Sequence, residues 1–135
     1  MKIILISHGD FAKSLLNAAE MIMGAQEDMS AFGIYPGADV EKLEKQLESI
    51  IMEYIEQGER VFVLTDVFFG TPFNMTVRMM EKLDFRHFTG VNMPVLLEMI
   101  SMKDSMAEPA IVDKLMEIGN TSFMDVNRFV NEQEE

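Results

Sequence analysis

Residues 2–10 read KIILISHGD, a short strand followed directly by the turn that ends it. The first six residues, KIILIS, are mostly apolar and β-branched, which is typical of a buried strand. His8 follows at once, and a helical pattern begins at Phe11. In an open α/β sheet the carboxyl ends of strands carry ligands and chemistry. His8 is therefore predicted to lie where an imidazole serves as a nucleophile or base near neutral pH.

Strand and helix patterns alternate along the rest of the chain, which indicates a doubly wound α/β fold with a mainly parallel sheet. A second unambiguous buried strand, RVFVLT, occupies residues 60–65. The simplest strand order for such a chain is 2-1-3-4, with helices on both faces of the sheet. We expect one domain over residues 1–135.

The ends of the expected helices are marked by capping residues. Asp10 is expected to cap the helix after the first strand, and Thr71 the helix after the third, with Pro72 as its first residue. Residues 121–130 fit either a strand or a helix, and 131–135 form an acidic tail. Strands are expected at residues 2–7, 29–35, 60–65 and 86–91, and helices from 11 to 24, 39 to 58, 71 to 83, 94 to 102 and 108 to 118.

Composition excludes several classes of protein. Hydrophobic residues make up 48% of the chain, which argues against disorder, and the absence of cysteine excludes disulfides and thiolate metal sites. The net charge of −12 argues against binding nucleic acid and favours protein partners with a basic face. No apolar run is long enough to span a bilayer, and the start lacks a signal-peptide pattern. We expect a soluble, cytoplasmic protein without a cofactor or a metal.

A strand order of 2-1-3-4 brings the loops after the first and third strands to one crevice. His8, Gly9 and Asp10 belong to the first loop, and the second contains Asp66 and the Gly70-Thr71 pair. A carboxylate that accepts a hydrogen bond from Nδ1 leaves Nε2 of the imidazole as a free nucleophile.

The helix that starts beside this pair offers unpaired backbone N–H groups to an anion. Gly70 lets the backbone approach closely, the Thr71 hydroxyl adds a donor, and Gly9 permits a tight turn. This combination predicts phosphoryl transfer to His8, with His8, Asp66 and Thr71 as catalytic residues. Phosphate binding is assigned to Gly9, Gly70 and Thr71, whereas His87 is expected to be structural.

Other chemistries need residues that are missing here. Histidine phosphatases and phosphoglycerate mutases carry an Arg-His-Gly motif, whereas Ser7 precedes His8 in this chain. Receiver domains need an acidic pair directly after the first strand, where this chain has His8. We find no nucleophile elbow, no Walker A loop and no Gly-rich dinucleotide motif. Two histidines without cysteine make a catalytic zinc site improbable.

The chain resembles the enzyme IIA component of the mannose-type family of the bacterial phosphoenolpyruvate:sugar phosphotransferase system. The resemblance covers residues 1–117 and is strongest in the segments IILISHGDFAKSLLNAAEMIMG, VLTDVFFGTPFN and TGVNMPVLLEM. It implies that His8 accepts a phosphoryl group at Nε2 from the phosphohistidine of HPr. Enzyme IIB would then receive the group and phosphorylate incoming sugar through membrane components. Asp66 and Thr71 match the aspartate and the hydroxyl residue of the family.

The resemblance also implies a homodimer, which some members form by exchanging a C-terminal strand, and residues 121–127 could supply that strand. The chain departs from the family at Phe69, where a glycine is usual. Phe68 and Phe69 thereby form an apolar patch suited to docking.

Because the chain ends without a linker, we expect enzyme IIB to be a separate polypeptide. The alternatives are a regulatory phosphoacceptor domain and a carrier for dihydroxyacetone phosphorylation, and the transported sugar is not encoded in this chain.

Overall fold

The computed structural model describes residues 1–134, which group into two compact units, residues 1–93 and the residues from 94 onward. The expectation of one domain over 1–135 stays a prediction. In chain order the elements are β1 (Lys2–His8), α1 (Phe11–Met23), β2 (Met29–Ile34), α2 (Val40–Glu56), β3 (Val61–Thr65), α3 (Thr71–Met80), β4 (Arg86–Thr89), α4 (Met93–Met102), α5 (Glu108–Thr121) and α6 (Val126–Gln133).

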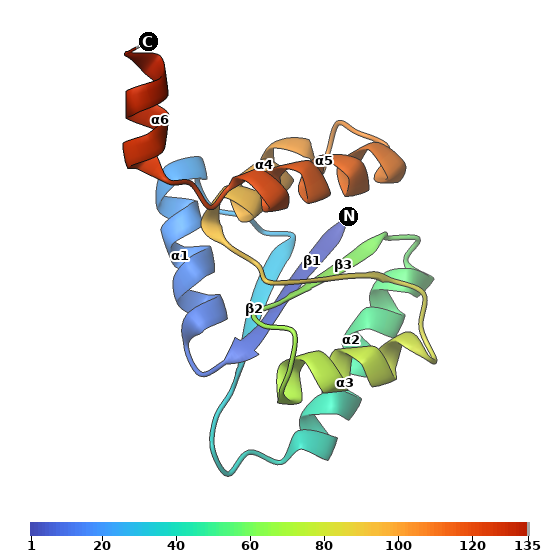
Figure 1. The fold of residues 1–135 in the computed structure, drawn as a ribbon. Coiled ribbons are helices and arrows are strands. Elements are labelled where there is room, and N and C mark those ends of the chain that lie inside the picture. Colours follow the sequence, from blue (N-terminus) through green and yellow to red (C-terminus); the bar gives the residue numbers. More distant parts are fainter. Residues whose placement is uncertain (135) are drawn as a thin grey trace. The chain divides into compact units, whose positions relative to one another are not determined.

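The first unit contains a four-stranded parallel sheet in the order β2-β1-β3-β4, which confirms the predicted topology (Figure 1). β1 is central because its apolar run is buried on both faces from Ile3 to Ser7. The registers pair His8 with Ile34 of β2 and Ile6 with Thr65 of β3. The carboxyl ends of β1, β2 and β3 therefore meet at one edge of the sheet.

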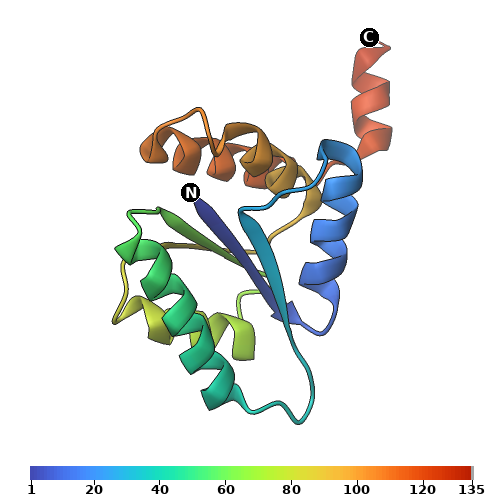
Figure 2. The same ribbon diagram turned by 180° about the vertical axis from the view of Figure 1, so that it is seen from behind.

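Helices cover both faces of this sheet, as predicted. Figures 1 and 2 show α1 on one face and α2 and α3 on the other. The reason is the direction of the crossovers: β1 to β2 runs one way, whereas β2 to β3 and β3 to β4 run the other way. Right-handed connections that change direction place their helices on opposite faces. The same reversal creates the crevice at the ends of β1 and β3.

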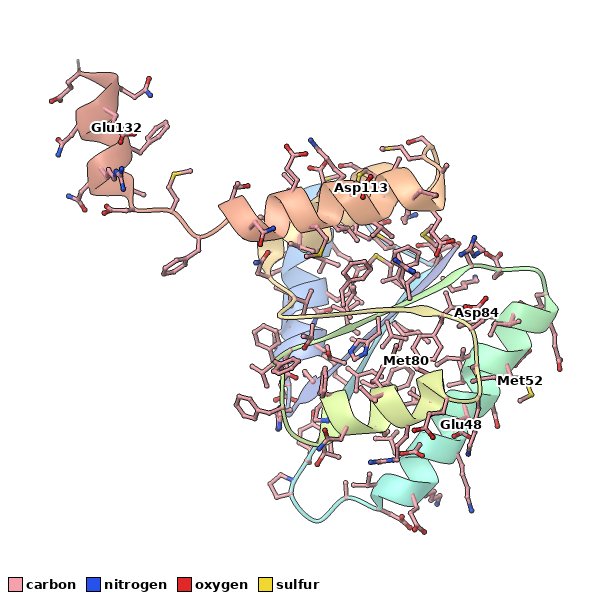
Figure 3. All side chains as sticks on the ribbon, turned by 45° about the vertical axis from the view of Figure 1, so that its right-hand side comes forward. Glu48, Met52, Met80, Asp84, Asp113 and Glu132 are labelled. Carbon is pink, nitrogen blue, oxygen red and sulfur yellow. The ribbon has the colours of Figure 1, made fainter. Side chains whose placement is uncertain are left out.

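The core between the sheet and the helices α2 and α3 is mostly aliphatic and also buries Met75 and Met79. One surface ion pair joins these two helices, Arg78 to Glu44 at 2.7 Å, and a second joins Lys82, just after α3, to Glu48 of α2 at 3.2 Å (Glu48 is labelled in Figure 3). The buried residues of this cluster are Ile4, Ile6, Ile34, Leu47, Ile51, Val61, Val63, Met75, Met79 and Phe85.

The second unit is helical. Helices α4 and α5 lie side by side in both ribbon views, and a Cβ at Gly119 would stand 3.8 Å from the Val95 side chain (Figures 1 and 2). α6 buries none of its described side chains. The expected strand at 121–127 is wrong, because α5 continues to Thr121 and α6 begins at Val126. Val126, Phe129 and Val130 have helical spacing, and the Asp125 side chain caps their helix by accepting from the Arg128 N–H.

None of the helices within residues 1–134 is long and apolar enough to cross a membrane.

Candidate functional site

His8 is the last residue of β1, and its side chain is 52% exposed at the carboxyl edge of the sheet. The strand before it is buried, so the backbone of His8 is fixed while its ring faces solvent. The β1–β3 register ends with Ile6 opposite Thr65. Asp66, the next residue after β3, is thereby placed beside His8.

Asp66 binds His8 twice through the same oxygen. Its Oδ2 accepts from the backbone N–H of His8 at 2.9 Å and contacts Nδ1 of the ring at 2.8 Å. Its other oxygen, Oδ1, accepts from the backbone N–H of Val67 at 3.0 Å. Burial of Asp66 raises the pKa of its carboxyl group, but these hydrogen bonds and the nearby His8 outweigh burial and lower the pKa overall.

The ring of His8 is held in one tautomer by this contact. A carboxylate only accepts hydrogen bonds, so Nδ1 of His8 carries the proton that lies between it and Asp66. The lone pair of the neutral ring then resides on Nε2. The structure brings His8 and Asp66 together as the strand order predicted.

Nε2 of His8 faces the start of α3. Gly70, with φ +87°, precedes the helix so closely that a Cβ on it would stand 2.8 Å from Nε2. A side chain at position 70 would occupy the space where a group bonded to Nε2 must lie. Only glycine both adopts this backbone conformation readily and leaves that space open.

Thr71 lies at the expected place but in a different role. The N-cap of α3 is Gly70 and not Thr71, and Thr71 is the first helical residue. Gly70 lies close to His8, and because glycine has no side chain the helix begins there without a side-chain cap. The backbone N–H of Asn74 donates to the Gly70 carbonyl at 2.9 Å, and Pro72 has no N–H. The N–H groups of Thr71 and Phe73 in the first turn remain without helical acceptors.

Gly9 forms the turn between β1 and α1. Its backbone N–H donates to the Ile34 carbonyl at 2.8 Å, so this amide already has an acceptor at the end of β2. The contact of Gly9 with phosphate stays a prediction. The turn after His8 is thus fixed to both neighbouring strands, through Asp66 on one side and Ile34 on the other.

Two contacts of this turn were missed from the sequence. Asp10 occupies the N-cap position of α1, but its side chain makes no capping hydrogen bond, so the predicted capping role is wrong. The hydroxyl of Ser7 accepts from the Ala12 N–H at 2.8 Å and caps the helix instead. The Asp10 carboxylate accepts from the Tyr35 hydroxyl, which lies 25 residues further along the chain. A serine five residues before a helical N–H was the available signal for the cap.

His87 lies on β4, beneath the first turn of α3. Its Nε2 is 2.8 Å from the Thr65 hydroxyl, and its ring packs against Phe73 with centroids 5.4 Å apart. Burial lowers the pKa of His87 to about 4, which keeps the ring neutral near pH 7. These contacts support the first turn of α3 from below.

Across residues 1–134 we find no group of three or more histidine, cysteine, aspartate or glutamate side chains placed to hold a metal ion.

Comparison with known proteins gives the family of the chain. Residues 2–116 match the family described as EIIA-man, PTS system fructose IIA component. The chain is 28% identical over 126 residues to the "PTS system fructose-specific EIIA component" of Bacillus subtilis (strain 168), covering 91% of this chain and 84% of that protein. It is 31% identical over 103 residues to the "PTS system mannose-specific EIIAB component" of Escherichia coli (strain K12), covering 76% of this chain but only 32% of that longer protein.

A solved structure is similar in fold over most of the chain. The PTS IIA protein associated with the fucose utilization operon of Streptococcus pneumoniae has a TM-score of 0.85 and 29% identity, over 96% of this chain and 95% of its own.

Fold and matches together define a phosphotransferase-system protein that acts through a phosphohistidine. More closely, the chain belongs to the EIIA-man family, the mannose, fructose and sorbose class of enzyme IIA, and is a phosphoryl carrier for sugar uptake.

Proposed function

We propose that His8 is the phosphorylated residue, that it receives the phosphoryl group from phospho-HPr, and that enzyme IIB takes the group from it. The observation that carries this proposal is the orientation of the His8 ring. Nδ1 is bound to Asp66 at 2.8 Å, while Nε2 faces the start of α3 with no side chain at Gly70 to cover it.

Transfer to His8 follows from this arrangement. The lone pair of Nε2 attacks phosphorus, the Nε2–P bond forms, and the N–P bond of the donor phosphohistidine breaks with its electron pair left on the donor ring. The His8 ring keeps the proton on Nδ1 and therefore becomes positively charged. The Asp66 carboxylate, ionised because its pKa is lowered, stabilises that charge. Transfer to enzyme IIB reverses these steps.

The start of α3 is suited to the negative charge of the phosphoryl oxygens. Backbone N–H groups at Thr71 and Phe73 and the positive end of the helix dipole favour an anion there. We assign the Thr71 hydroxyl as an additional donor, and Gly70 as the residue that keeps the space open. Gly9 acts through its turn, since its amide is bound to Ile34.

The partners follow from the relay. HPr and enzyme IIB meet this chain in the cytoplasm, and the membrane is involved only through the transporter that enzyme IIB serves. The protein works as a homodimer. The exposed apolar side chains of α6 support this assignment, because a helix of 8 residues is marginal in water without a surface to pack on.

Intact-mass analysis after incubation with phospho-HPr tests the proposal. One phosphoryl group adds about 80 Da to the wild-type chain. His8→Gln should show no adduct, whereas His87→Gln, the matched change at the other histidine, should keep it. Addition of enzyme IIB should remove the adduct from the wild-type chain. An adduct on His8→Gln would place the acceptor elsewhere, and an adduct that enzyme IIB leaves in place would indicate a regulatory phosphoacceptor.

A further inference from the structure

Two phenylalanine side chains stand in solvent beside the reactive histidine. Phe68 is 75% exposed and Phe69 is 69% exposed, and both belong to the loop between β3 and α3. The same loop begins with Asp66 and ends with Gly70, which are the two residues that border the His8 ring. Adjacent exposed aromatic rings at a site of chemistry mark a surface that another molecule covers.

The two rings differ in what they do for the fold. Phe68 packs against Phe73 in the first turn of α3, with ring centroids 5.0 Å apart and a tilt of 58°. Phe73 in turn packs against His87. Phe68 therefore belongs to the support of the helix start, although most of its surface is exposed.

Phe69 has no such role among the described residues. Its ring packs on no other aromatic ring of residues 1–134, and its backbone is not in the left-handed region, which only glycines of the described chain occupy. The usual glycine of the family is thus replaced without backbone strain, because the positive φ falls on Gly70. The fold gives no reason for an aromatic side chain at position 69.

The position of Phe69 beside the His8 ring explains an aromatic side chain there. It is bonded to Gly70, whose backbone borders Nε2 of His8, and consecutive Cα atoms are only about 3.8 Å apart. A donor phosphohistidine must bring its phosphorus to within bonding distance of Nε2. The phosphohistidine ring belongs to a folded donor protein, so the donor surface around that ring must also lie against residue 69 of this chain.

We propose, as an extension of the phosphoryl-transfer function proposed above, that Phe69 is the apolar anchor by which this chain binds its phosphohistidine-carrying donor protein, with Phe68 as the fixed ring beside it. The matching donor surface has an apolar depression next to its phosphohistidine, and basic residues around that depression fit a chain of net charge −12. An aromatic anchor at the centre of a small, short-lived interface supplies a large part of the binding free energy.

Phe69→Ala tests the proposal by separating docking from chemistry. Two donors are compared on each variant, phospho-HPr and the small molecule phosphoramidate, which phosphorylates histidine without a protein surface. The matched control is Phe123→Ala, which removes a fully exposed phenylalanine between α5 and α6.

For Phe69→Ala we expect the KM for phospho-HPr to rise about tenfold, with little change in kcat and an unchanged rate with phosphoramidate. Phe69→Leu should recover most of the loss, since it restores an apolar side chain. Phe123→Ala should match the wild type with both donors.

Three results would overturn the proposal. The first is an unchanged KM for phospho-HPr in Phe69→Ala. The second is an equal loss with phosphoramidate, which would make Phe69 part of the chemical site. The third is a lower molecular mass of Phe69→Ala in light scattering, which would assign the ring to a second copy of the chain. Failure of the wild-type chain to be labelled by either donor would instead refute the function proposed for His8.

Discussion

The hydroxyl of Tyr35 donates a hydrogen bond to Oδ1 of Asp10, and this bond ties the segment after β2 to the turn that follows His8. The bond also raises the pKa of Tyr35, because the neighbouring carboxylate opposes loss of the phenolic proton. Asp10 makes no capping bond to α1, so its contact with Tyr35 replaces the local role that a helix N-cap aspartate usually has.

Tyr35→Phe should therefore loosen the turn without unfolding the domain. The orientation of the His8 ring becomes less fixed, and we expect severalfold slower labelling by phosphoramidate with little change in Tm. Tyr54→Phe is the matched control, since the ring of Tyr54 packs near Lys2, at the opposite end of β1 from His8. Equal labelling rates for both variants and the wild type would show that the Tyr35–Asp10 bond has no part in positioning His8.

Asp66→Asn should preserve the fold and slow phosphoryl transfer. An amide nitrogen beside Nδ1 favours the tautomer with the proton on Nε2, which removes the nucleophilic lone pair, and it brings no charge to stabilise the phosphorylated ring. Loss of the equivalent carboxylate in serine proteases costs about 10⁴ in rate, which we take as an upper limit. Asp39→Asn, at the cap of α2, is the matched change away from His8.

Two measurements compare Asp66→Asn with the wild type: the rate of phosphoryl labelling and the ¹⁵N NMR signature of the His8 ring. In the wild type the proton should be on Nδ1, and in Asp66→Asn the population should move toward Nε2. A wild-type rate together with an unchanged tautomer would reduce Asp66 to a residue of the turn.

The His8–Asp66 pair could be predicted from the sequence because it depends on topology alone. Two apolar runs each end in a polar residue, and the strand order 2-1-3-4 sets those two ends side by side. β3 is buried along its whole length and β1 from Ile3 to Ser7, which makes both strands central, so the pairing follows once the strand order is known.

The capping of α1 could not be predicted in the same way. Ser7 and Asp10 are both good capping residues near the start of one helix, and local preference favours the aspartate at the N-cap. The choice is made by Tyr35, which takes the Asp10 carboxylate from a distant part of the chain. The helix at α6 was ambiguous for a related reason: apolar residues near its start fit a strand or a helix until partners are known, and here the local helical spacing prevails.

Gly70→Ala should block the site more than it harms the fold. Position 70 has φ +87°, so alanine is expected to cost about 1–2 kcal/mol of stability. In addition, its Cβ would stand 2.8 Å from Nε2 of His8, in the space that the proposed function assigns to the phosphoryl group. Gly37→Ala is the matched control, because position 37 has φ +83° but nothing within 4 Å of an added Cβ.

Both glycine variants should lose similar stability in urea unfolding, and only Gly70→Ala should lose labelling by phosphoramidate. Full labelling of a folded Gly70→Ala protein would mean that the phosphoryl group does not use the space between His8 and α3.

His87 should make the protein less stable in acid. Burial lowers its pKa from 6.5 to about 4 in the folded chain, so between these values the unfolded chain binds the proton more readily. The contribution of neutral His87 is complete above pH 6.5 and is lost as the pH falls toward 4. Urea unfolding at pH 7 and pH 5 measures this difference, which should be smaller in His87→Gln than in the wild type. Equal pH dependence in the two proteins would contradict a neutral, buried His87.

The last prediction concerns α6 and the proposed homodimer. The apolar side chains Val126, Phe129 and Val130 share one face of this helix and are all exposed in the single chain. Replacing Phe129 and Val130 by serine should give a folded monomer in light scattering, because the surface that would pack on the second copy is lost. The matched control replaces Asn127 and Asn131, on the polar side of the same helix, by serine as well, and should stay dimeric. Monomers in the wild type would refute the dimer itself, whereas a dimeric Phe129/Val130 variant would move the interface away from α6. The Phe129/Val130 variant and the Asn127/Asn131 control should differ because helical propensity changes little in either, whereas apolar surface is removed only in the Phe129/Val130 variant.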